Sequence, residues 1–270
     1  MVDRVALRRT KLLYLFAYKA SICYNNHNTN FVFAKGENST NFIIFIFIIS
    51  YLVIKGVDFM LLTGKTIVLG ITGGIAAYKM PNVAHALVKL GADVHVLMTK
   101  NATEFISPLV FETLTHRRCQ VDTFDRNFQY DVAHISLANA ADLMLIAPAT
   151  ANVIAKMAHG QADDMLTTVT LAATCPKLIA PAMNTHMLEN QITQDNLKTL
   201  EHYGFTVIPS GSGMLACGDV GSGRLPDEGV LVDYVLRELA CEKDLKGKKV
   251  VVSAGATQEP MDPVRYLTNH

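Results

Sequence analysis

The stretch KTIVLGITGGIAAYKMPNVAHALVKLG, residues 65–91, decides the fold class of this chain. Residues 65–70 form a short apolar run with β-branched side chains, which predicts a buried strand. A turn containing Gly73 and Gly74 follows, and an amphipathic pattern that stops at Gly91 predicts a helix. A buried strand that passes through a glycine turn into a helix is the repeating unit of doubly wound α/β sheets.

The same unit recurs along the chain. The sequence predicts further strands at 93–98, 142–147, 177–182 and 205–210, with helices at about 107–114, from 151, at 190–203 and at 228–240. Apolar strands that alternate with helices are typical of a parallel sheet covered on both faces. We therefore expect a doubly wound α/β domain of the Rossmann-like, flavodoxin-like kind.

Composition narrows the choice of partners. The 270 residues carry 24 Lys+Arg and 24 Asp+Glu, so the formal net charge is zero. The sequence also lacks a basic block, which argues against nucleic acid or an anionic membrane as the main partner. The five cysteines are scattered and never spaced as CxxC. That pattern excludes a disulfide scaffold or a zinc ribbon and predicts a reducing, cytoplasmic setting without a metal site.

The two ends of the chain differ from its centre. Residues 1–59 include the apolar run FIIFIFIISYLVI at 42–54, which is shorter than the roughly 20 residues of a membrane-spanning helix. We expect Met60 to be the functional start and residues 1–59 to be a spurious or disordered extension, with a membrane anchor as the alternative. The main domain is expected at 60–245. A new strand at 250–254, followed by a glycine turn, predicts the start of a second βα domain at 246–270.

The turn after the first strand is a candidate phosphate site. Backbone N–H groups at a helix start attract anions, and Gly73 and Gly74 would let a phosphate approach closely. The spacing is not GxGxxG, and the second strand leads to Thr99, where a dinucleotide site would carry Asp or Glu. The hydroxyls of Thr99 and Ser107 suit a terminal phosphate, which favours FMN over NAD. A tight turn without a ligand is the alternative.

The third strand ends in PATAN, residues 148–152, at the edge where open α/β sheets bind ligands. Backbone amides and the side chains of Thr150 and Asn152 could bond the heteroatoms of a flavin ring. The small side chains of Ala149 and Ala151 would let that ring lie close. Ordinary capping of the following helix is the alternative interpretation.

The fourth strand ends in PAMNTHM, residues 181–187, at the same edge. The amide of Asn184 both donates and accepts hydrogen bonds, so it can orient a polar substrate without adding a charge. The alternative is that Asn184 caps the next helix, with Met183 and Met187 as core residues.

Two further residues are candidates for proton transfer. His134 lies near the start of a predicted short helix, where the helix dipole disfavours the imidazolium; a structural histidine is the alternative. Cys217 lies among glycines in GSGMLACGDVGSGRLPD, residues 211–227, which fits neither a phosphate-loop template nor a domain linker. We interpret this stretch as a flap that closes over substrate, with Cys217 as proton donor and Arg224 as a weaker candidate for substrate contact.

Several motifs together resemble a known enzyme family: TGGIAAYK, AHISLANAADL, PATANVIAKMAHGQADDML, PAMNTHM and ACGDVGSGRLPD. They are similar to the homo-oligomeric flavin-containing cysteine decarboxylases, and within them to the phosphopantothenoylcysteine decarboxylases. The resemblance runs from about Leu62 to the C-terminus. The chain departs from the family pattern at Thr150, where the family has Ser, and at Leu188, where it has Trp. The tail resembles the opening of a CTP- and Mg²⁺-dependent phosphopantothenate–cysteine ligase domain, and we expect no ligase activity from this piece.

The resemblance implies a cofactor and a reaction. FMN would place its phosphate at the turn formed by Gly73, Gly74, Ile75 and Ala76, and its ring against 149–152 and Met183. The reaction would convert 4′-phosphopantothenoylcysteine to 4′-phosphopantetheine in coenzyme A biosynthesis. Flavin would oxidise the thiol arm to a thioaldehyde, CO₂ would leave, and the resulting enethiolate would be reduced again.

The resemblance also implies residue roles. His134 would assist oxidation and decarboxylation from a neighbouring subunit, Asn184 would hold the carboxylate, and Cys217 would donate the final proton. The remaining substrate contacts implied are Met187, Ala216, Gly218 and Arg224. A trimer or a multiple of trimers follows. The alternatives are a peptidyl-cysteine decarboxylase, a flavin prenyltransferase and a non-catalytic flavin-binding regulatory subunit.

Overall fold

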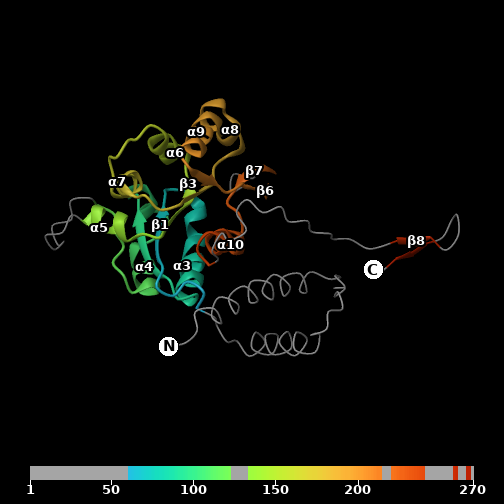
Figure 1. Ribbon diagram of the computed structural model, residues 1–270. Coiled ribbons are helices and arrows are strands. Elements are labelled where there is room, and N and C mark those ends of the chain that lie inside the picture. The colour runs from blue at the N-terminus through green and yellow to red at the C-terminus, as the bar shows by residue number, and fades with distance from the viewer. Residues whose placement is uncertain (1–59, 123–132, 215–219, 241–257, 261–265, 269–270) are drawn as a thin grey trace, which may run out of the picture. The chain divides into compact units, whose positions relative to one another are not determined.

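The computed structural model describes residues 60–122, 133–214 and 220–240, together with two short strands (Figure 1). Those strands, β8 (Gln258–Pro260) and β9 (Tyr266–Thr268), pair with each other as an antiparallel hairpin. The strand predicted at 250–254 lies outside the described residues. The compact unit that carries the sheet spans Phe59–Ala240. Among the helices that the structure describes, none is both long and apolar enough to cross a membrane.

A five-stranded parallel sheet in the order β2-β1-β3-β4-β5 forms the centre of this unit. The strands are β1 (Thr66–Ile71), β2 (Asp93–Met98), β3 (Leu143–Ala149), β4 (Lys177–Pro181) and β5 (Phe205–Val207). This order confirms the predicted doubly wound, flavodoxin-like fold. After β1 the chain adds β2 on one side of the sheet and then β3, β4 and β5 on the other, so the strand order switches between β1 and β3. Ligands of such sheets bind at the carboxyl ends of the strands on either side of that point.

Side chains alternate between the two faces of the sheet, as the pleat requires. Val68, Met144 and Ile179 belong to a core shared with α5 (Ala133–Ala140), α6 (Ala151–Ala158), α7 (Met165–Ala172) and α9 (Gln191–His202). The opposite face is covered by α3 (Met80–Lys89), α4 (Pro108–Thr115) and α10 (Glu228–Leu239) (Figure 1). Helices on both faces account for strands that are apolar throughout.

One predicted helix changes type along its length. The helix expected after the glycine turn begins as the 3₁₀ helix η1 (Ile75–Lys79) before α3 continues from Met80. Pro81 sits in the first turn of α3, where a proline is tolerated, whereas inside one continuous helix it would break the hydrogen-bond ladder. The helix expected at 190–203 is α9, as predicted, and the short helix α8 (Thr185–Glu189) precedes it.

The division between α8 and α9 falls at Asn190, whose side chain accepts a hydrogen bond from the Ile192 N–H at 3.0 Å. An Asn that caps a helix leaves the helical conformation itself, so the preceding helix must end there. The strand predicted at 205–210 stops at Val207, two residues before Pro209, which has no N–H for the sheet ladder.

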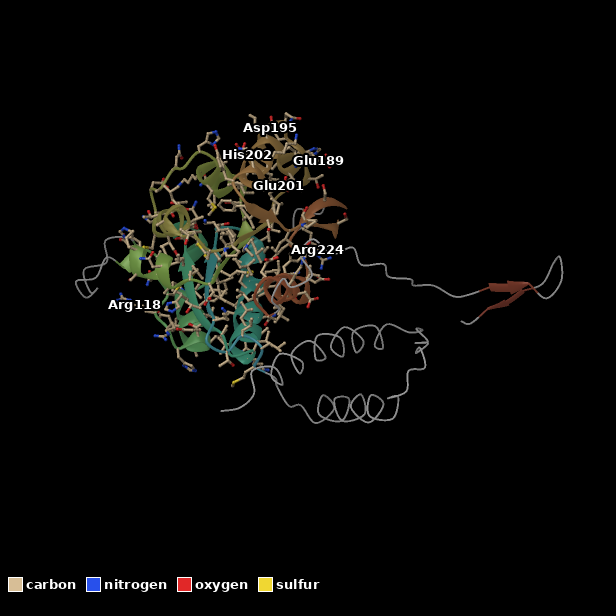
Figure 2. The ribbon with its side chains drawn as sticks, viewed as in Figure 1. Arg118, Glu189, Asp195, Glu201, His202 and Arg224 are labelled. Carbon is tan, nitrogen blue, oxygen red and sulfur yellow. The ribbon has the colours of Figure 1, made fainter. Side chains whose placement is uncertain are left out.

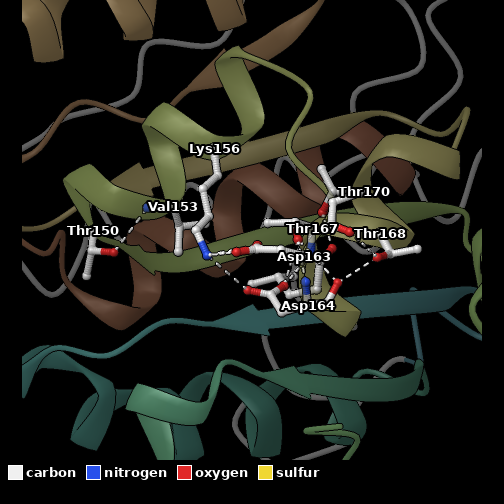
Figure 3. A network of polar contacts seen from close by, with 10 residues as sticks. Thr150, Val153, Lys156, Asp163, Asp164, Thr167, Thr168 and Thr170 are labelled. Carbon is white, nitrogen blue, oxygen red and sulfur yellow. Dashed lines mark hydrogen bonds and ion pairs between the residues drawn. The ribbon is translucent and has the colours of Figure 1, made fainter. Parts of the chain in front are cut away.

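The helix predicted from 151 is α6, and an ion-paired loop joins it to the next helix, α7 (Figure 3). Lys156 Nζ of α6 lies 2.7 Å from Asp163 Oδ2 and 3.9 Å from Asp164 Oδ2. Asp164 in turn caps α7 in a reciprocal capping box with Thr167. The Lys156 ammonium therefore links α6 to the start of α7. The first turn of α6 follows the carboxyl end of β3 directly.

Asp142 joins the starts of β1 and β3. Its carboxylate accepts hydrogen bonds from Lys65 Nζ at 2.9 Å and from the Thr66 N–H at 2.8 Å. Burial alone would raise the pKa of Asp142, but these hydrogen bonds and the Lys65 charge together hold the pKa below its usual value. A carboxyl group with a lowered pKa in the folded state stabilises the protein above its unfolded pKa, and that contribution is lost as the pH falls through the folded pKa.

We therefore expect Asp142→Asn to lower the free energy of unfolding by about 1 kcal/mol at neutral pH. The difference from the unmodified chain should shrink as the pH falls below about 4, where the unfolded aspartate begins to protonate. Urea unfolding at pH 7 and pH 3 measures both values. Asp195→Asn on the exposed face of α9 is the control. An equal loss at both pH values for Asp142→Asn would contradict this account.

Candidate functional site

Thr72 joins the two loops that meet at the carboxyl edge of β1 and β3. Its side chain is fully buried, and its Oγ1 donates to the Pro148 carbonyl at 2.6 Å. The same oxygen accepts the Thr150 N–H at 3.1 Å. The glycine turn and the PATAN segment, predicted separately as ligand loops, are thus held together by one hydroxyl. Sequence reasoning missed Thr72, although a Thr directly between a buried strand and two glycines was the available signal.

Gly73 allows a second loop to close onto the glycine turn. A Cβ at Gly73 would lie 2.5 Å from Asn101 Cβ and 2.9 Å from the Asn101 carbonyl carbon, inside the van der Waals limit. Gly74 is different, because a Cβ there would only touch Thr150 Cγ2 at an ordinary 3.8 Å. Gly73 is therefore required by the fold itself. Gly74 leaves the backbone at the start of η1 open on one side.

Thr99 carries an unsatisfied polar atom at this turn. The residue is 7% exposed, and its Oγ1 is a buried side-chain oxygen without a hydrogen-bond partner among the described residues. Its N–H donates to the Ile71 carbonyl at 3.0 Å, which places Thr99 beside the end of β1. An unsatisfied buried hydroxyl costs about 1–3 kcal/mol, and the binding of a phosphate by this one stays a prediction. Thr99 precedes the 3₁₀ helix η2 (Lys100–Glu104), which contains Asn101, the residue that faces Gly73.

The residues at this edge fit a phosphate group. The Thr99 hydroxyl can donate to a phosphate oxygen, and the backbone at Gly74 is accessible at the start of a helix. Ser107 is more exposed, and its Oγ caps α4 by accepting the Leu109 N–H at 3.3 Å. Ile75 is 58% exposed, and Ala76 is half-buried. A phosphate role for Ser107, Ile75 and Ala76 stays a prediction.

The PATAN segment performs the capping role that was the alternative interpretation. Thr150 Oγ1 accepts the Val153 N–H at 3.5 Å at the start of α6. Ala149 is fully buried within β3, Ala151 is half-buried and Asn152 is exposed. Capping does not exclude a flavin contact, because the exposed first turn of α6 lies beside the glycine turn through Thr72. That contact stays a prediction.

Asn184 lies just after β4, at the same carboxyl edge of the sheet. Its Oδ1 accepts the His186 N–H at 2.9 Å and so caps α8, as the alternative interpretation held. Asn184 is half-buried, as is Met183, whereas Met187 is 50% exposed. The cap fixes the orientation of the Asn184 side chain at the end of β4. Its proposed contact with a substrate carboxylate stays a prediction.

A two-stranded ribbon of β6 (Gly211–Met214) and β7 (Val220–Arg224) lies against this turn. The Met183 N–H donates to the Gly223 carbonyl at 3.0 Å, and Thr185 Oγ1 donates to the Ser222 carbonyl at 2.8 Å. Gly223 has a φ of +110°, and a Cβ there would clash with the Met183 carbonyl oxygen. A Cβ at Gly221 would lie 2.5 Å from Thr185 Oγ1.

These two glycines have a different explanation from the one expected from the sequence. The glycine-rich stretch was interpreted as a flap, with glycines that permit opening and closing. At Gly221 and Gly223 the structure shows instead that the backbone packs directly on residues 183–185, so a side chain has no room. The described part of the stretch is a docked ribbon. Ala216, Cys217 and Gly218 lie outside the described residues, and their roles stay predictions.

Arg224 ends this ribbon and is exposed. Figure 2 shows it at the margin of the unit, near the ribbon and away from Glu189 on α8. Its Nη2 lies 3.8 Å from Asp227 Oδ1. The backbone of the preceding residue, Gly223, packs on Met183 and Asn184, so Arg224 starts beside the Asn184 turn although the two are far apart in sequence. Its role in binding substrate stays a prediction.

His134 lies at the start of α5, as predicted, and is half-buried. α5 packs against α7, whereas α8 contacts α9 and β7. Figure 1 draws α5 and α8 on opposite sides of the unit. The structure therefore does not bring His134 and Asn184 together within one chain.

The two cysteines whose surroundings are described are unsuited to proton transfer. Burial, with a smaller contribution from the Glu112 charge, raises the pKa of the Cys119 thiol to about 12. Burial also raises the pKa of Cys175, which packs against the core. Thiols with raised pKa values stay protonated and inert near neutral pH. The packing role expected for both from the sequence agrees with this environment.

Comparisons with known proteins agree with these motifs. Residues 60–240 match the family model "Flavoprotein", and residues 245–270 match the "DNA/pantothenate metabolism flavoprotein C-terminal domain". The coenzyme A biosynthesis bifunctional protein CoaBC of Vibrio cholerae is 47% identical over 209 residues, and that of Bacillus subtilis is 45% identical over 211 residues. Each match covers 77% of this chain and 52% of the relative, so the chain spans about half the length of these curated relatives.

Solved structures of similar proteins cover the same region. A cysteine-to-serine mutant of PPC decarboxylase, complexed with pantothenoylaminoethenethiol, is 31% identical with a TM-score of 0.57, covering 63% of this chain and 96% of that one. The FMN binding protein AtHal3 is 31% identical with a TM-score of 0.56, covering 64% of this chain and 95% of that one. The chain therefore belongs to the flavoprotein family of flavin-containing cysteine decarboxylases.

Proposed function

We propose that this chain is a carboxy-lyase that decarboxylates 4′-phosphopantothenoylcysteine to 4′-phosphopantetheine in coenzyme A biosynthesis. The observation that carries the proposal is the 31% identity to PPC decarboxylase over 96% of that chain. This relative is matched over nearly its whole length, whereas the bifunctional relatives are matched over half of theirs.

FMN is the cofactor that the site fits. The unpartnered hydroxyl of Thr99 and the open backbone at Gly74 would hold its phosphate, and the first turn of α6, with Met183, would border its ring. Bound flavin supplies the two-electron oxidation and reduction that make loss of CO₂ from a cysteine amide feasible. The protein's own part is to bind and orient the substrate and to move protons.

Three residues would orient the substrate and move protons. Asn184, held by its cap on α8, would orient the substrate carboxylate with a neutral amide. His134 would accept a proton during oxidation of the thiol arm. Cys217 would return a proton to carbon after CO₂ has left.

A second copy of the chain would complete the site. His134 and Asn184 are separated within one chain, so His134 would act in a neighbouring subunit's site. Apolar side chains of η1 and of the segment after η2 are exposed: Ile75 at 58%, Tyr78 at 61%, Phe105 at 48% and Leu109 at 65%. We propose that another subunit covers them. We therefore include a trimer, or a multiple of trimers, in the proposal.

The direct test uses the full chain. The purified protein should be yellow, with flavin absorbance near roughly 450 nm, and should release CO₂ from 4′-phosphopantothenoylcysteine. A peptide ending in cysteine, supplied in parallel, separates this activity from that of a peptidyl-cysteine decarboxylase. A colourless protein that releases no CO₂ after incubation with FMN would contradict the proposal.

A further inference from the structure

The guanidinium of Arg224 extends over Gly213 of β6, a residue without a side chain. Its Nη1 lies 3.4 Å, and its Cδ 3.8 Å, from the position that a Cβ on Gly213 would take. The Arg224 Cβ lies 4.0 Å from the equivalent position on Gly211. The Arg224 side chain therefore lies along the face of β6 that Gly211 and Gly213 leave bare, and it stays 47% exposed to solvent.

Arg224 is held close to the Asn184 turn. The residue before it, Gly223, accepts the Met183 N–H at 3.0 Å through its carbonyl group. Thr185, on the other side of Asn184, bonds the Ser222 carbonyl at 2.8 Å. The backbone from which the Arg224 side chain starts is thus fixed beside the residue proposed to hold the substrate carboxylate.

The charge of Arg224 is only weakly compensated. Within the part of the chain that the structure describes, its ion-pair partner is Asp227, with Nη2 and Oδ1 3.8 Å apart. The two side chains are 47% and 77% exposed, and an exposed pair at this distance is worth little. A guanidinium has five N–H donors in a planar fork, which suits an oxyanion that can accept two parallel hydrogen bonds.

The substrate of the proposed function offers two oxyanions, the carboxylate that leaves and the phosphate at the other end. A cation on the carboxylate would stabilise the ground state more than the transition state, because negative charge leaves that group as CO₂ departs. The neutral amide of Asn184 suits the carboxylate better. The phosphate carries more charge and does not react, so a strong ion pair there aids binding without slowing the chemistry.

We infer that Arg224 binds the phosphate of the substrate and sets the preference of the site for phosphorylated over dephosphorylated ligands. This inference rests on the proposed function. It assigns a specificity-determining role to a residue outside the candidate proton-transfer groups.

The test compares 4′-phosphopantothenoylcysteine with pantothenoylcysteine. For Arg224→Met, we expect kcat/KM on the phosphorylated substrate to fall about 30-fold, mainly through KM, with a change below about twofold on the dephosphorylated one. Arg224→Lys should recover part of the loss, because it restores the charge without the fork. Arg237→Met on α10 is the matched control and should leave both values unchanged. Added salt should raise KM for the phosphorylated substrate in the unmodified chain and have little effect on Arg224→Met.

Two results would overturn the inference. One is an equal loss on both substrates in Arg224→Met, which would indicate a structural role. The other is an unmodified chain without any preference for the phosphorylated substrate. Calorimetric binding of 4′-phosphopantetheine and pantetheine repeats the comparison without turnover. If the unmodified chain decarboxylates neither substrate, the proposed function fails, and the binding ratio in Arg224→Met still decides the role of Arg224.

Discussion

Cys217→Ser is expected to release CO₂ but to form almost no 4′-phosphopantetheine. A serine hydroxyl is a far weaker acid than a thiol, so the proton that completes the product would no longer be supplied. The enethiol, lighter than the product by two hydrogens, should accumulate, and formation of saturated product should fall on the order of 100-fold or more. Mass spectrometry of the products, alongside a CO₂ measurement, gives both numbers.

Cys119→Ser and Cys175→Ser are the matched controls for this experiment. Burial raises the pKa of both thiols, so neither is suited to donate a proton near neutral pH. Both variants should therefore form the saturated product. Full turnover by Cys217→Ser would remove Cys217 from the mechanism, whereas loss of CO₂ release would move its role to an earlier step.

Gly73→Val is expected to weaken FMN binding by about 100-fold, equivalent to about 2.8 kcal/mol. A Cβ at this position would stand 2.5 Å from Asn101 Cβ and 2.9 Å from its carbonyl carbon. A backbone carbon cannot rotate away as the end of a flexible side chain can, so the loop that starts at Thr99 would have to move. Titration of the apoprotein with FMN, followed by flavin fluorescence, measures the dissociation constant.

Two milder variants separate the loss of a hydrogen-bonding hydroxyl from the steric effect of an added side chain. Thr99→Val removes the unpartnered hydroxyl without touching the backbone, and we expect a loss in FMN affinity of about tenfold. Gly74→Ala should lose less than Gly73→Val, because the added carbon meets only Thr150 Cγ2 at 3.8 Å and its φ of −163° is ordinary extended backbone. Unchanged FMN affinity in Gly73→Val would refute the placement of the phosphate at this turn.

The sheet was predictable from sequence because its strands are apolar throughout and its helices are periodic. The glycine turn, the PATAN segment and Asn184 were placed correctly at strand ends, since the carboxyl ends of parallel strands share one edge. The contacts that unite these loops could not be predicted in the same way. Thr72 bonds Pro148, and Gly73 meets Asn101, across segments far apart in the chain. Such partners are set by packing.

Local chemistry also explains the errors in element boundaries. Amphipathic periodicity runs through Lys79 and Pro81 without a break, so the change from a 3₁₀ to an α-helix was hidden. The ribbon of β6 and β7 lacked any strand signal, because glycine has low β-propensity and the stretch has no alternating apolar residues. Its strands form because neighbouring residues 183–185 supply hydrogen bonds.

The alternation of Gly221, Ser222 and Gly223 determines which face of β7 meets the Asn184 turn. Successive residues of a strand point to opposite faces, so glycines two apart present the same bare face to Met183 and Thr185. Slipping this strand by a single position would turn the Ser222 side chain toward a space that cannot hold it. The Gly-x-Gly pattern thus fixes the register of β7 against residues 183–185. It allows one alignment of the ribbon on the turn, and with it one placement of the residues on either side.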